Sequence, residues 1–462
     1  MNKKRKEQDA LGELEVPTDA YWGISTQRAL HNFKISGRAF PERFIIALAR
    51  VKKACLLVNM KNEDIDQEIG KATLQAVDEI LKDGKFLDQF PIDVFQTGSG
   101  TQTNMNMNEV LANRANEILG KALGTKSPVH PNDHVNMGQS SNDVIPTAMH
   151  LSALDALSNE LFPAIHTLIQ ALEKKIDEFE GVVKVGRTHL QDAVPIPLST
   201  EFEVYRTQMM ASFSNLQSVR DDLVTVPIGG TALGTGINAP GDFGPRVSEQ
   251  LAKLVELPIK SHPMKAEGIA SHSVIVKASG ALRLLALACL KMANDIRWMG
   301  SGPRAGLGEL ILPVNEPGSS IMPGKVNPTQ SEALIQVCMQ VMGHDATIAS
   351  AEGFGSILDL NVTKPVMIVN LLDAVQILSR GITSFTENCL LGLEPNKEQI
   401  QRHLDRSLMI VTRLSPVIGY DQASKVAKRA LETGKTIRET VQHMGIKFEG
   451  DLDDILDPLK MV

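Results

Sequence analysis

The stretch from Leu154 to Phe179, LDALSNELFPAIHTLIQALEKKIDEF, indicates which kind of fold this chain adopts. Its apolar residues recur every three or four positions, at Leu154, Leu157, Leu161, Ile165, Leu168, Leu172, Ile176 and Phe179. This spacing places them on one face of a long amphipathic helix of the kind found in helical bundles. Pro163 lies inside the stretch and is expected to kink the helix, because proline removes a backbone hydrogen bond.

Further apolar segments show the same helical spacing. One of them runs through Phe202, Tyr205, Met209, Phe213, Leu216, Val219 and Leu223. Val274–Met299 is apolar on nearly every side, which is typical of a helix buried all round, as at the centre of an oligomer. Ser331–Met342 and Val366–Phe385 are two more helix candidates. We therefore predict an all-α fold whose centre, within Val144–Phe385, is a bundle of about five long helices.

The regions on either side of this bundle contain shorter helical stretches. Pro41–Lys61 and Ile65–Lys82 are examples before Gln139, and the pattern shortens again after Pro395 and Asn396. We expect three domains: residues 1–139, mixed and mainly helical; residues 140–395, the long-helix bundle and oligomer core; and residues 396–462, small and helical.

The charge balance excludes one class of partner. The chain has 47 Lys and Arg against 54 Asp and Glu, a net charge of −7, so it lacks the basic surface of a nucleic-acid-binding protein. The dense charge at Lys3–Lys6 is interpreted as a solvated N-terminal tail. An acidic protein that binds an anion needs positive charge or hydrogen-bond donors close to the binding site. We therefore expect such a site within individual polar segments.

Cysteine usage and hydropathy bear on metals and location. Cys55, Cys289, Cys338 and Cys389 are widely spaced, so we expect buried reduced thiols and no metal site. Met1–Ala10 is polar and does not resemble a signal peptide. The apolar stretch Ala278–Leu290 is too short to span a bilayer, so we expect no membrane association and a cytoplasmic location.

Two polar segments precede the long helices. The first is Thr97–Asn104, TGSGTQTN, whose glycines and hydroxyls suit an anion, although a polar turn before a helix explains it equally well. The second comprises His130–Asp133 and Gln139–Asp143. One residue of Gln139–Asp143 is expected to cap the following helix, and the excess of hydroxyls and amides favours carboxylate binding there.

Two more polar segments follow further along the chain. The third, Gly186–Asp192, contains His189 between two apolar helices; a lone histidine is more often structural, but such a polar cluster is costly unless it is satisfied. The fourth, Gly318–Pro328, is rich in glycine and proline and is predicted to be a loop. Glu332 follows it at the start of the next helix.

The fourth segment, GSSIMPGKVNP, resembles the signature loop of the fumarase/aspartase superfamily, and the other three match the same family in the same order across the whole chain. Within the superfamily, Gln96–Glu109 and Gly324 resemble the class II fumarases most closely. His189 points the same way, because aspartases typically carry glutamine at that position. Ser127 and Pro128, in contrast, stand where many fumarases have basic residues.

The resemblance implies the reversible hydration of fumarate to L-malate, a tricarboxylic acid cycle reaction with carbanion chemistry and no cofactor or metal. It implies that Ser319 is the base, that His189 handles the departing hydroxyl through water, and that Glu332 polarises His189. Lys325 would stabilise the developing charge. Substrate-binding residues carried over from the family are Ser99, Gly100, Thr101, Ser140, Ser141, Asn142, Thr188, Ser320, Lys325, Val326 and Asn327. A second anion site would comprise His130, Pro131, Asn132 and Asp133.

The resemblance also implies a homotetramer in which three chains build each active site around a small dicarboxylate. Two alternatives stay open. An aspartase would eliminate ammonia from a related substrate, and His189 argues against it. A non-catalytic protein on the same fold would be expected to have lost Ser319, His189, Lys325 or Glu332, and all four are present.

Overall fold

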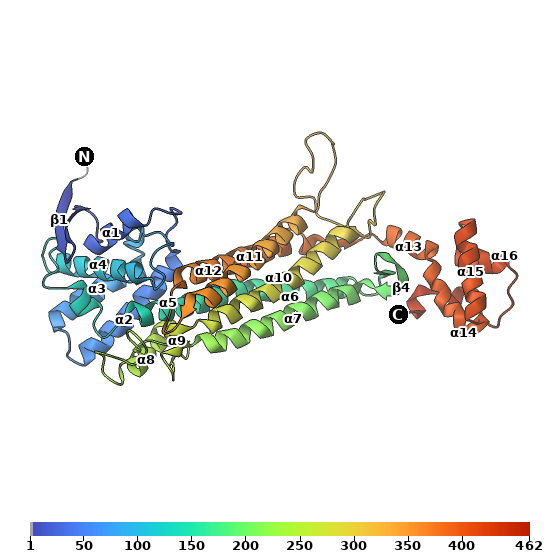
Figure 1. Ribbon diagram of the computed structural model, residues 1–462. Helices are drawn as coiled ribbons and strands as arrows, with labels where there is room; N and C mark the ends of the chain where they lie inside the picture. Colours follow the sequence, from blue (N-terminus) through green and yellow to red (C-terminus); the bar gives the residue numbers. More distant parts are fainter. Residues whose placement is uncertain (1–2) are drawn as a thin grey trace. The chain divides into compact units, whose positions relative to one another are not determined.

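The computed structural model describes residues 3–462 and is mainly helical, with only short strands (Figure 1). The chain forms two compact units, each built from three separate segments. The first unit comprises the chain up to Phe162 together with Ser214–Arg283 and Gln340–Ile377. The second unit comprises Pro163–Phe213, Leu284–Met339 and Leu378–Val462. The division into residues 1–139, 140–395 and 396–462 stays a prediction.

The long helices predicted from the apolar spacing are all present (Figure 1). The stretch Leu154–Phe179 covers the end of α5 (Ser141–Ala156), the short η3 (Leu157–Leu161) and α6 (Phe162–Glu178). These three elements follow one another directly. The others are α7 (Leu198–Leu223), α10 (Ser273–Met299), α11 (Thr329–Gly355) and α12 (Lys364–Asn388). These helices confirm the prediction of an all-α fold.

Pro163 is accommodated by a change of helix type just before it. Residues Leu157–Leu161 form a π-turn, in which the Phe162 N–H donates to the Leu157 carbonyl instead of to a carbonyl four residues back. Proline has no N–H to close a regular turn, so one additional residue in the preceding turn absorbs the mismatch. In place of a simple kink at Pro163, the helix therefore has a π-turn on the N-terminal side of this residue.

The first unit begins with a two-stranded hairpin, β1 (Lys4–Asp9) and β2 (Gly12–Pro17), paired antiparallel from Lys4 with Pro17 to Asp9 with Gly12. The expectation of a solvated tail at Lys3–Lys6 is therefore wrong. Arg5 explains why, because its guanidinium donates to the carbonyls of Pro17 (2.7 Å) and Ala20 (2.8 Å) and thereby satisfies partly buried acceptors.

Short helices and strands make up the rest of the first unit. They are α1 (Ile24–Asn32), α2 (Glu42–Lys61), α3 (Gln67–Asp83), η1 (Leu87–Gln89), α4 (Thr101–Ile118), η2 (Pro131–Val135), β5 (Thr225–Val226), α8 (Phe243–Val255), β6 (Lys260–Ser261), α9 (Glu267–Ala270), β8 (Ser356–Ile357) and β9 (Leu360–Asn361). Helix α2 is central, because it packs against α3, α5 and α8. The stretches Pro41–Lys61 and Ile65–Lys82 are confirmed as α2 and α3.

The second unit adds hairpins and the C-terminal helices to its part of the long helices. Its further elements are β3 (Val183–Thr188), β4 (Gln191–Pro197), β7 (Leu310–Ile311), η4 (Leu390–Gly392), β10 (Glu394–Pro395), α13 (Lys397–Arg406), η5 (Leu408–Leu414), α14 (Ser415–Ile418), α15 (Tyr420–Thr433), α16 (Ile437–His443), α17 (Leu452–Ile455) and η6 (Pro458–Lys460). The break expected at Pro395 and Asn396 is confirmed, since Asn396 caps α13 by accepting the Gln399 N–H at 3.2 Å.

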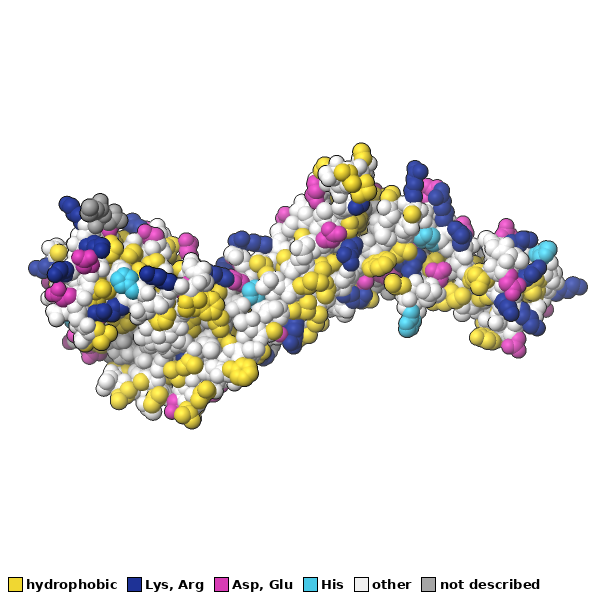
Figure 2. Space-filling model, turned by 45° about the horizontal axis from the view of Figure 1, so that its top comes forward, with side chains coloured by type: hydrophobic (Ala, Val, Ile, Leu, Met, Phe, Trp, Pro, Cys, Tyr) yellow, Lys and Arg dark blue, Asp and Glu magenta, His cyan; other side chains and the backbone are white. Residues whose placement is uncertain are grey.

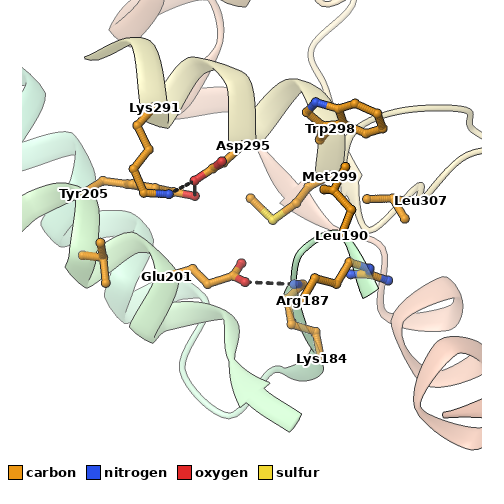
Figure 3. Close-up of a pocket in the computed structure, with 11 residues that line it drawn as sticks. Lys184, Arg187, Leu190, Glu201, Tyr205, Lys291, Asp295, Trp298, Met299 and Leu307 are labelled. Carbon is orange, nitrogen blue, oxygen red and sulfur yellow. Dashed lines mark hydrogen bonds and ion pairs between the residues drawn. The ribbon is translucent and has the colours of Figure 1, made fainter. Parts of the chain in front are cut away.

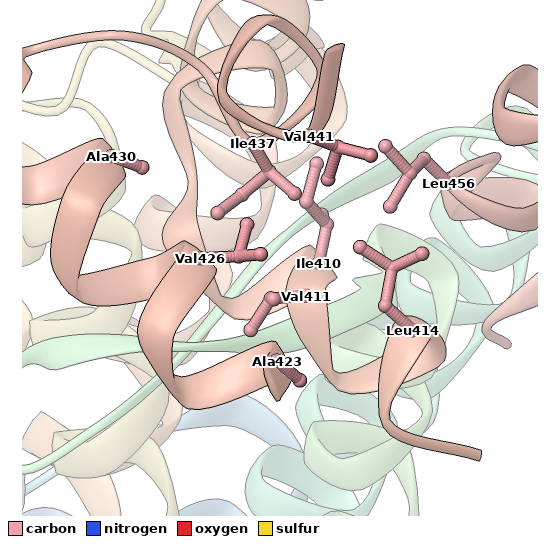
Figure 4. Close-up of a cluster of buried hydrophobic side chains, with 9 residues drawn as sticks. All are labelled: Ile410, Val411, Leu414, Ala423, Val426, Ala430, Ile437, Val441 and Leu456. Atoms are coloured by element: carbon pink, nitrogen blue, oxygen red, sulfur yellow. The ribbon is translucent and has the colours of Figure 1, made fainter. Parts of the chain in front are cut away.

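The C-terminal helices share a small apolar core of their own (Figure 4). Its buried members are Ile410, Val411, Leu414, Ala423, Val426, Ala430, Ile437, Val441 and Leu456. They come from η5, α15, α16 and the residue that ends α17, so this part of the second unit is held together by apolar packing between four elements.

Two of the long helices are strongly apolar. In the described chain, Ser273–Met299 and Lys364–Gly392 are long and apolar enough to cross a membrane by length and composition alone. The argument that Ala278–Leu290 is too short is therefore wrong, because the helix continues well beyond both ends of that stretch. Buried helices of globular cores satisfy the same criterion.

Candidate active site

The four polar segments are divided equally between the units. Thr97–Asn104 and the paired segment His130–Asp133 with Gln139–Asp143 belong to the first unit, whereas Gly186–Asp192 and Gly318–Pro328 belong to the second. Each unit therefore carries one half of the candidate site's residues.

The first polar segment is held against the backbone that precedes α12. A Cβ atom on Gly98 would lie 1.3 Å from the Val362 carbonyl oxygen, so only glycine permits this approach. The Lys364 N–H donates to the Gly98 carbonyl at 3.0 Å. Gly100 then adopts a left-handed conformation with φ 74° and leads directly into α4. The loop is thus fixed on both sides of Ser99.

A chain of hydroxyl groups joins two helix N-termini in the first unit. Ser99 Oγ lies 2.7 Å from Thr101 Oγ1, which lies 2.8 Å from Ser141 Oγ. Thr101 is the first residue of α4 and Ser141 is the first residue of α5. Free N–H groups and the helix dipole favour negative charge at both ends, so this cluster is suited to binding a carboxylate.

The start of α5 is capped as expected. Ser140 Oγ accepts the Asn142 N–H at 3.2 Å, and Asp143 Oδ1 accepts the Ser140 N–H at 2.9 Å, which together form a capping box. The Asn142 side chain donates to the Ala232 carbonyl at 2.9 Å. Ser140 therefore caps the helix, while the neighbouring hydroxyl of Ser141 belongs to the hydroxyl chain.

Two buried charges that sequence reasoning missed support this helix start. Asp143 Oδ2 accepts the N–H groups of Gly229 (3.0 Å) and Thr231 (2.8 Å), and burial raises the pKa of Asp143 to about 6. Lys52 of α2 donates to Asn136 Oδ1 (3.0 Å), and burial lowers the pKa of Lys52 to about 7. A lysine on an otherwise apolar helix face was the only signal in the sequence.

His130–Asp133 forms the start of η2. His130 Nδ1 accepts the N–H groups of Asn132 at 3.3 Å and Asp133 at 3.2 Å, so the imidazole caps this short turn. Asn132 and Asp133 are exposed, whereas Pro131 is buried. Lys126, the nearby basic residue, donates to the Gln8 carbonyl at 2.8 Å.

In the second unit, His189 lies at the tip of the β3–β4 hairpin. Thr188 pairs with Gln191, so His189 and Leu190 are the two residues of the turn, with φ of 57° and 58°. Positive φ at both positions is the type I′ combination, which normally uses asparagine and glycine. Each side chain held there costs about 1–2 kcal/mol. The turn is strained and presents Thr188 and His189 to solvent.

A cavity of about 240 Å³ lies beside this hairpin (Figure 3). On one side, Lys184 Nζ of β3 lies 3.0 Å from Glu201 Oε1 of α7. On the other side, the Tyr205 hydroxyl donates to Asp295 at 3.0 Å, and Lys291 lies 5.7 Å from the centre of the Tyr205 ring. Burial, followed by the Asp295 charge, raises the pKa of Tyr205.

The fourth polar segment is a loop, as predicted, and its two ends are joined. The Gly318 N–H donates to the Lys325 carbonyl at 2.8 Å, and Asn327 Nδ2 donates to the Gly318 carbonyl at 2.7 Å. A Cβ on Gly318 would come within 2.5 Å of the Lys325 oxygen. Figure 1 shows the chain between α10 and α11 extending away from these helices. Ser320, Lys325 and Val326 are exposed on it.

Ser319 has a specific environment within this loop. Its Oγ accepts the N–H groups of Ile321 at 3.2 Å and Met322 at 3.1 Å. Two amide dipoles directed at one oxygen stabilise negative charge on it. Glu332 is half-buried in the first turn of α11, and among residues 3–462 no hydrogen bond joins its carboxylate to the His189 ring.

The cysteines and the other candidate metal ligands do not cluster within residues 3–462. Cys55, Cys289, Cys338 and Cys389 are free and buried, as expected. Within residues 3–462, no group of three or more His, Cys, Asp and Glu side chains is placed to hold a metal ion.

Comparison with known proteins extends over the whole chain. Residues 12–343 match the family described as "Lyase", and residues 410–462 match "Fumarase C C-terminus". The chain is 51% identical to the class II fumarate hydratase of Thermosynechococcus vestitus (97% of this chain, 96% of the relative) and 49% identical to the mitochondrial fumarate hydratase of Rhizopus oryzae (100% and 93%). The crystal structure of the class II fumarase from Schistosoma mansoni is similar with a TM-score of 0.96, at 38% identity over 99% of each chain.

Fold and site together define a lyase of the fumarase/aspartase superfamily. Within that superfamily, the chain belongs to the class II fumarase family. This confirms the resemblance drawn from the four polar segments, as well as the all-α, fumarase-like fold.

Proposed function

We propose that this chain catalyses the reversible addition of water to fumarate to form L-malate. The observation that supports this proposal most directly is the Ser319 hydroxyl, which accepts two backbone N–H groups in the loop that also carries Lys325. Similarity over the full length to fumarate hydratases supports the choice of substrate.

The difficult step of the reaction is removal of a proton from the carbon next to a carboxylate. That carbon acid is very weak, and the intermediate is an aci-carboxylate with two negative charges on one carboxyl group. The protein can make it accessible only by directing hydrogen-bond donors at that charge. Lys325 supplies an ammonium group, and Asn327 has a second N–H besides the one that it donates to Gly318.

Ser319 would take this proton as an alkoxide. A serine hydroxyl is far too weak a base unless its ionised form is stabilised. The N–H groups of Ile321 and Met322 already point at Ser319 Oγ, and the nearby Lys325 charge would add to their effect. Ser320 and Val326 would contribute to the same carboxylate-binding loop.

His189 would protonate the departing hydroxyl, or activate water in the reverse direction, and Glu332 would polarise its imidazole. We further propose a homotetramer in which three chains build each site, so that His189 meets its partners across chain boundaries. The substrate carboxylates would then bind Thr188 and, from the first unit, Ser99, Gly100, Thr101, Ser140, Ser141 and Asn142. We assign this activity to the tricarboxylic acid cycle and place the protein in the cytoplasm. We also propose that His130–Asp133 forms a secondary anion site.

The first test is to incubate the purified protein with fumarate and to follow the conjugated double bond by ultraviolet absorbance. We expect consumption without ammonium and L-malate as the product. Consumption only with ammonium, yielding aspartate, would instead identify an ammonia-lyase. No reaction under either condition would favour a non-catalytic role on the same fold.

Replacing the base tests its assignment. We expect Ser319→Ala to lower kcat by about 10²–10⁴-fold, because the group that takes the proton is lost. Binding of fumarate should persist, since the donors of the loop backbone remain. Steady-state kinetics measure the first effect and circular dichroism checks that the variant is folded. Near-native kcat in a folded variant would rule out Ser319 as the base.

A further inference from the structure

Glu309 is a buried carboxylate on which three basic side chains converge. It is fully buried in the second unit. Its Oε1 lies 2.7 Å from Arg187 Nη1 and 3.2 Å from His403 Nδ1, and its Oε2 lies 3.3 Å from Lys184 Nζ. A buried ion cluster of this kind is costly to form. Within residues 3–462, Glu309 Oε2 has the Lys184 ion pair but no hydrogen bond.

The backbone fixes the position of this carboxylate independently of its side-chain partners. The Glu309 N–H donates to the Met299 carbonyl at 2.8 Å, and the Glu309 carbonyl accepts the Asn396 N–H at 2.8 Å. Glu309 is therefore tied to the end of α10 and to the residue that caps α13. It is a rigid anchor rather than a side chain on a free loop.

Two of the three groups that contact Glu309 belong to the hairpin that carries His189, and the third, His403, lies on α13. Lys184 and Arg187 both lie on β3, on either side of the irregularity between Val185 and Arg187. Lys184 has a second carboxylate partner, Glu201, at 3.0 Å. Arg187 depends on Glu309 for its charge pairing, and it is only two positions before His189 in the sequence.

The turn beyond Arg187 is the part of the hairpin that needs support. His189 and Leu190 both occupy the left-handed region, which their side chains disfavour. Strained conformations persist only when the surrounding structure over-determines them. The Arg187–Glu309 ion pair at the base of the turn supplies such a constraint.

We infer that Glu309 is a positioning residue for the proposed hydration reaction: by holding Arg187 and Lys184 it fixes the β3–β4 hairpin and the strained turn that presents His189. This inference rests on the proposed function, because it assigns His189 a role in that reaction. Glu309 itself does not contact the substrate and acts only through the hairpin.

The test measures kcat and KM for fumarate in Glu309→Gln, which keeps the shape of the side chain and removes its charge. We expect kcat to fall by about 10- to 100-fold, as for other displacements of a catalytic group, while KM changes by less than about threefold. The decisive variant adds Leu190→Gly, which relieves the turn of its strain. We expect the double variant to recover at least about threefold of the lost kcat, whereas Leu190→Gly alone changes kcat little.

Asp295→Asn is the matched control, because Asp295 lines the cavity beside the hairpin and contacts Tyr205 and Lys291 but not the hairpin. Its kcat should stay close to that of the parent protein. The inference is overturned if Glu309→Gln keeps its kcat, if Leu190→Gly brings no recovery, or if Asp295→Asn loses as much. A parent protein without hydratase activity would refute the proposed function instead.

A second variant covers the case in which Glu309→Gln does not fold. Arg187→Lys keeps the positive charge but loses the planar guanidinium that pairs with Glu309. We expect a smaller loss of kcat than in Glu309→Gln, again partly recovered by Leu190→Gly. A folded Arg187→Lys variant with unchanged kcat, or one without recovery, would also overturn the inference.

Discussion

Single buried residues decide how the first half of the candidate site is held. Lys52 and Asp143 are both buried, and each contacts groups next to the N-terminus of α5. The polar segments themselves could be predicted, because clusters of hydroxyls and amides are unusual in an apolar chain. Lys52 could not, since a lone lysine in a helical pattern looks the same whether it is solvated or buried.

Lys52 gives a prediction about pH. Burial lowers its pKa to about 7, against about 10.4 for the unfolded chain. The unfolded protein therefore binds more protons between these values, so this group adds stability as the pH rises and loses it as the pH falls through 7. We expect the free energy of unfolding of the parent protein, relative to Lys52→Met, to rise by up to about 1.4 kcal/mol per pH unit between about pH 7 and 10.

Urea denaturation of both proteins at one fixed protein concentration measures this difference. Groups that do not interact with Lys52 titrate alike in the two proteins and cancel, whereas Asp143, whose pKa the Lys52 charge lowers, is expected to titrate higher in Lys52→Met. A difference that stays constant with pH would show that Lys52 does not titrate in the folded state as its burial implies.

At the scale of elements, helix ends carry much of the proposed binding chemistry. Residues 3–462 contain two capping boxes, Ser140 with Asp143 at α5 and Thr436 with Glu439 at α16. The positions of α2, α3, α7 and α10 followed from apolar periodicity, since the buried residues of a helix recur every three or four positions along one face. The β1–β2 hairpin was missed because its strands are rich in charged residues. The hydrogen bonds from Arg5 to backbone carbonyls, which hold these strands in place, could not be read from the sequence.

The two capping boxes allow stability to be separated from binding. We expect Ser140→Ala and Thr436→Ala each to lower the free energy of unfolding by about 0.5–2 kcal/mol, because each loses a cap. Only Ser140→Ala should also raise KM for fumarate, by about tenfold for a lost hydrogen bond to a charged group. Denaturation curves and steady-state kinetics test this. Equal KM values for the two variants would remove Ser140 from the binding site.

At the scale of the whole molecule, the proposed site residues divide between the two units. The hydroxyl chain of Ser99, Thr101 and Ser141 belongs to the first unit, whereas Ser319 and His189 belong to the second. The second unit also exposes apolar side chains on its long helices. Examples are Val204, Met210, Leu284, Leu287, Trp298 and Met339. Figure 2 shows patches of hydrophobic side chains on one face of the molecule. Such surface is usual where chains associate.

Sharing of sites between chains predicts complementation. We expect Ser141→Ala and Ser319→Ala to be nearly inactive alone, and mixed oligomers of the two to regain up to about a quarter of parental activity, since each site then draws its two halves from different chains. Co-expression with two affinity tags yields the mixed oligomers, and each variant taken through the same steps alone is the control. Mixed oligomers as inactive as either variant would argue for sites formed within single chains.

The sequence by itself determined the helical content, the loop at Gly318–Pro328 and the polar segments, because periodicity and composition are local properties of the chain. Only the tertiary structure decided that Asp143 and Glu309 are buried anchors and that His189 lies in a strained turn. The physical reason is that these features depend on contacts between residues far apart in sequence. Arg187 and Glu309 are separated by 122 positions, and their 2.7 Å ion pair exists only after the intervening chain has folded.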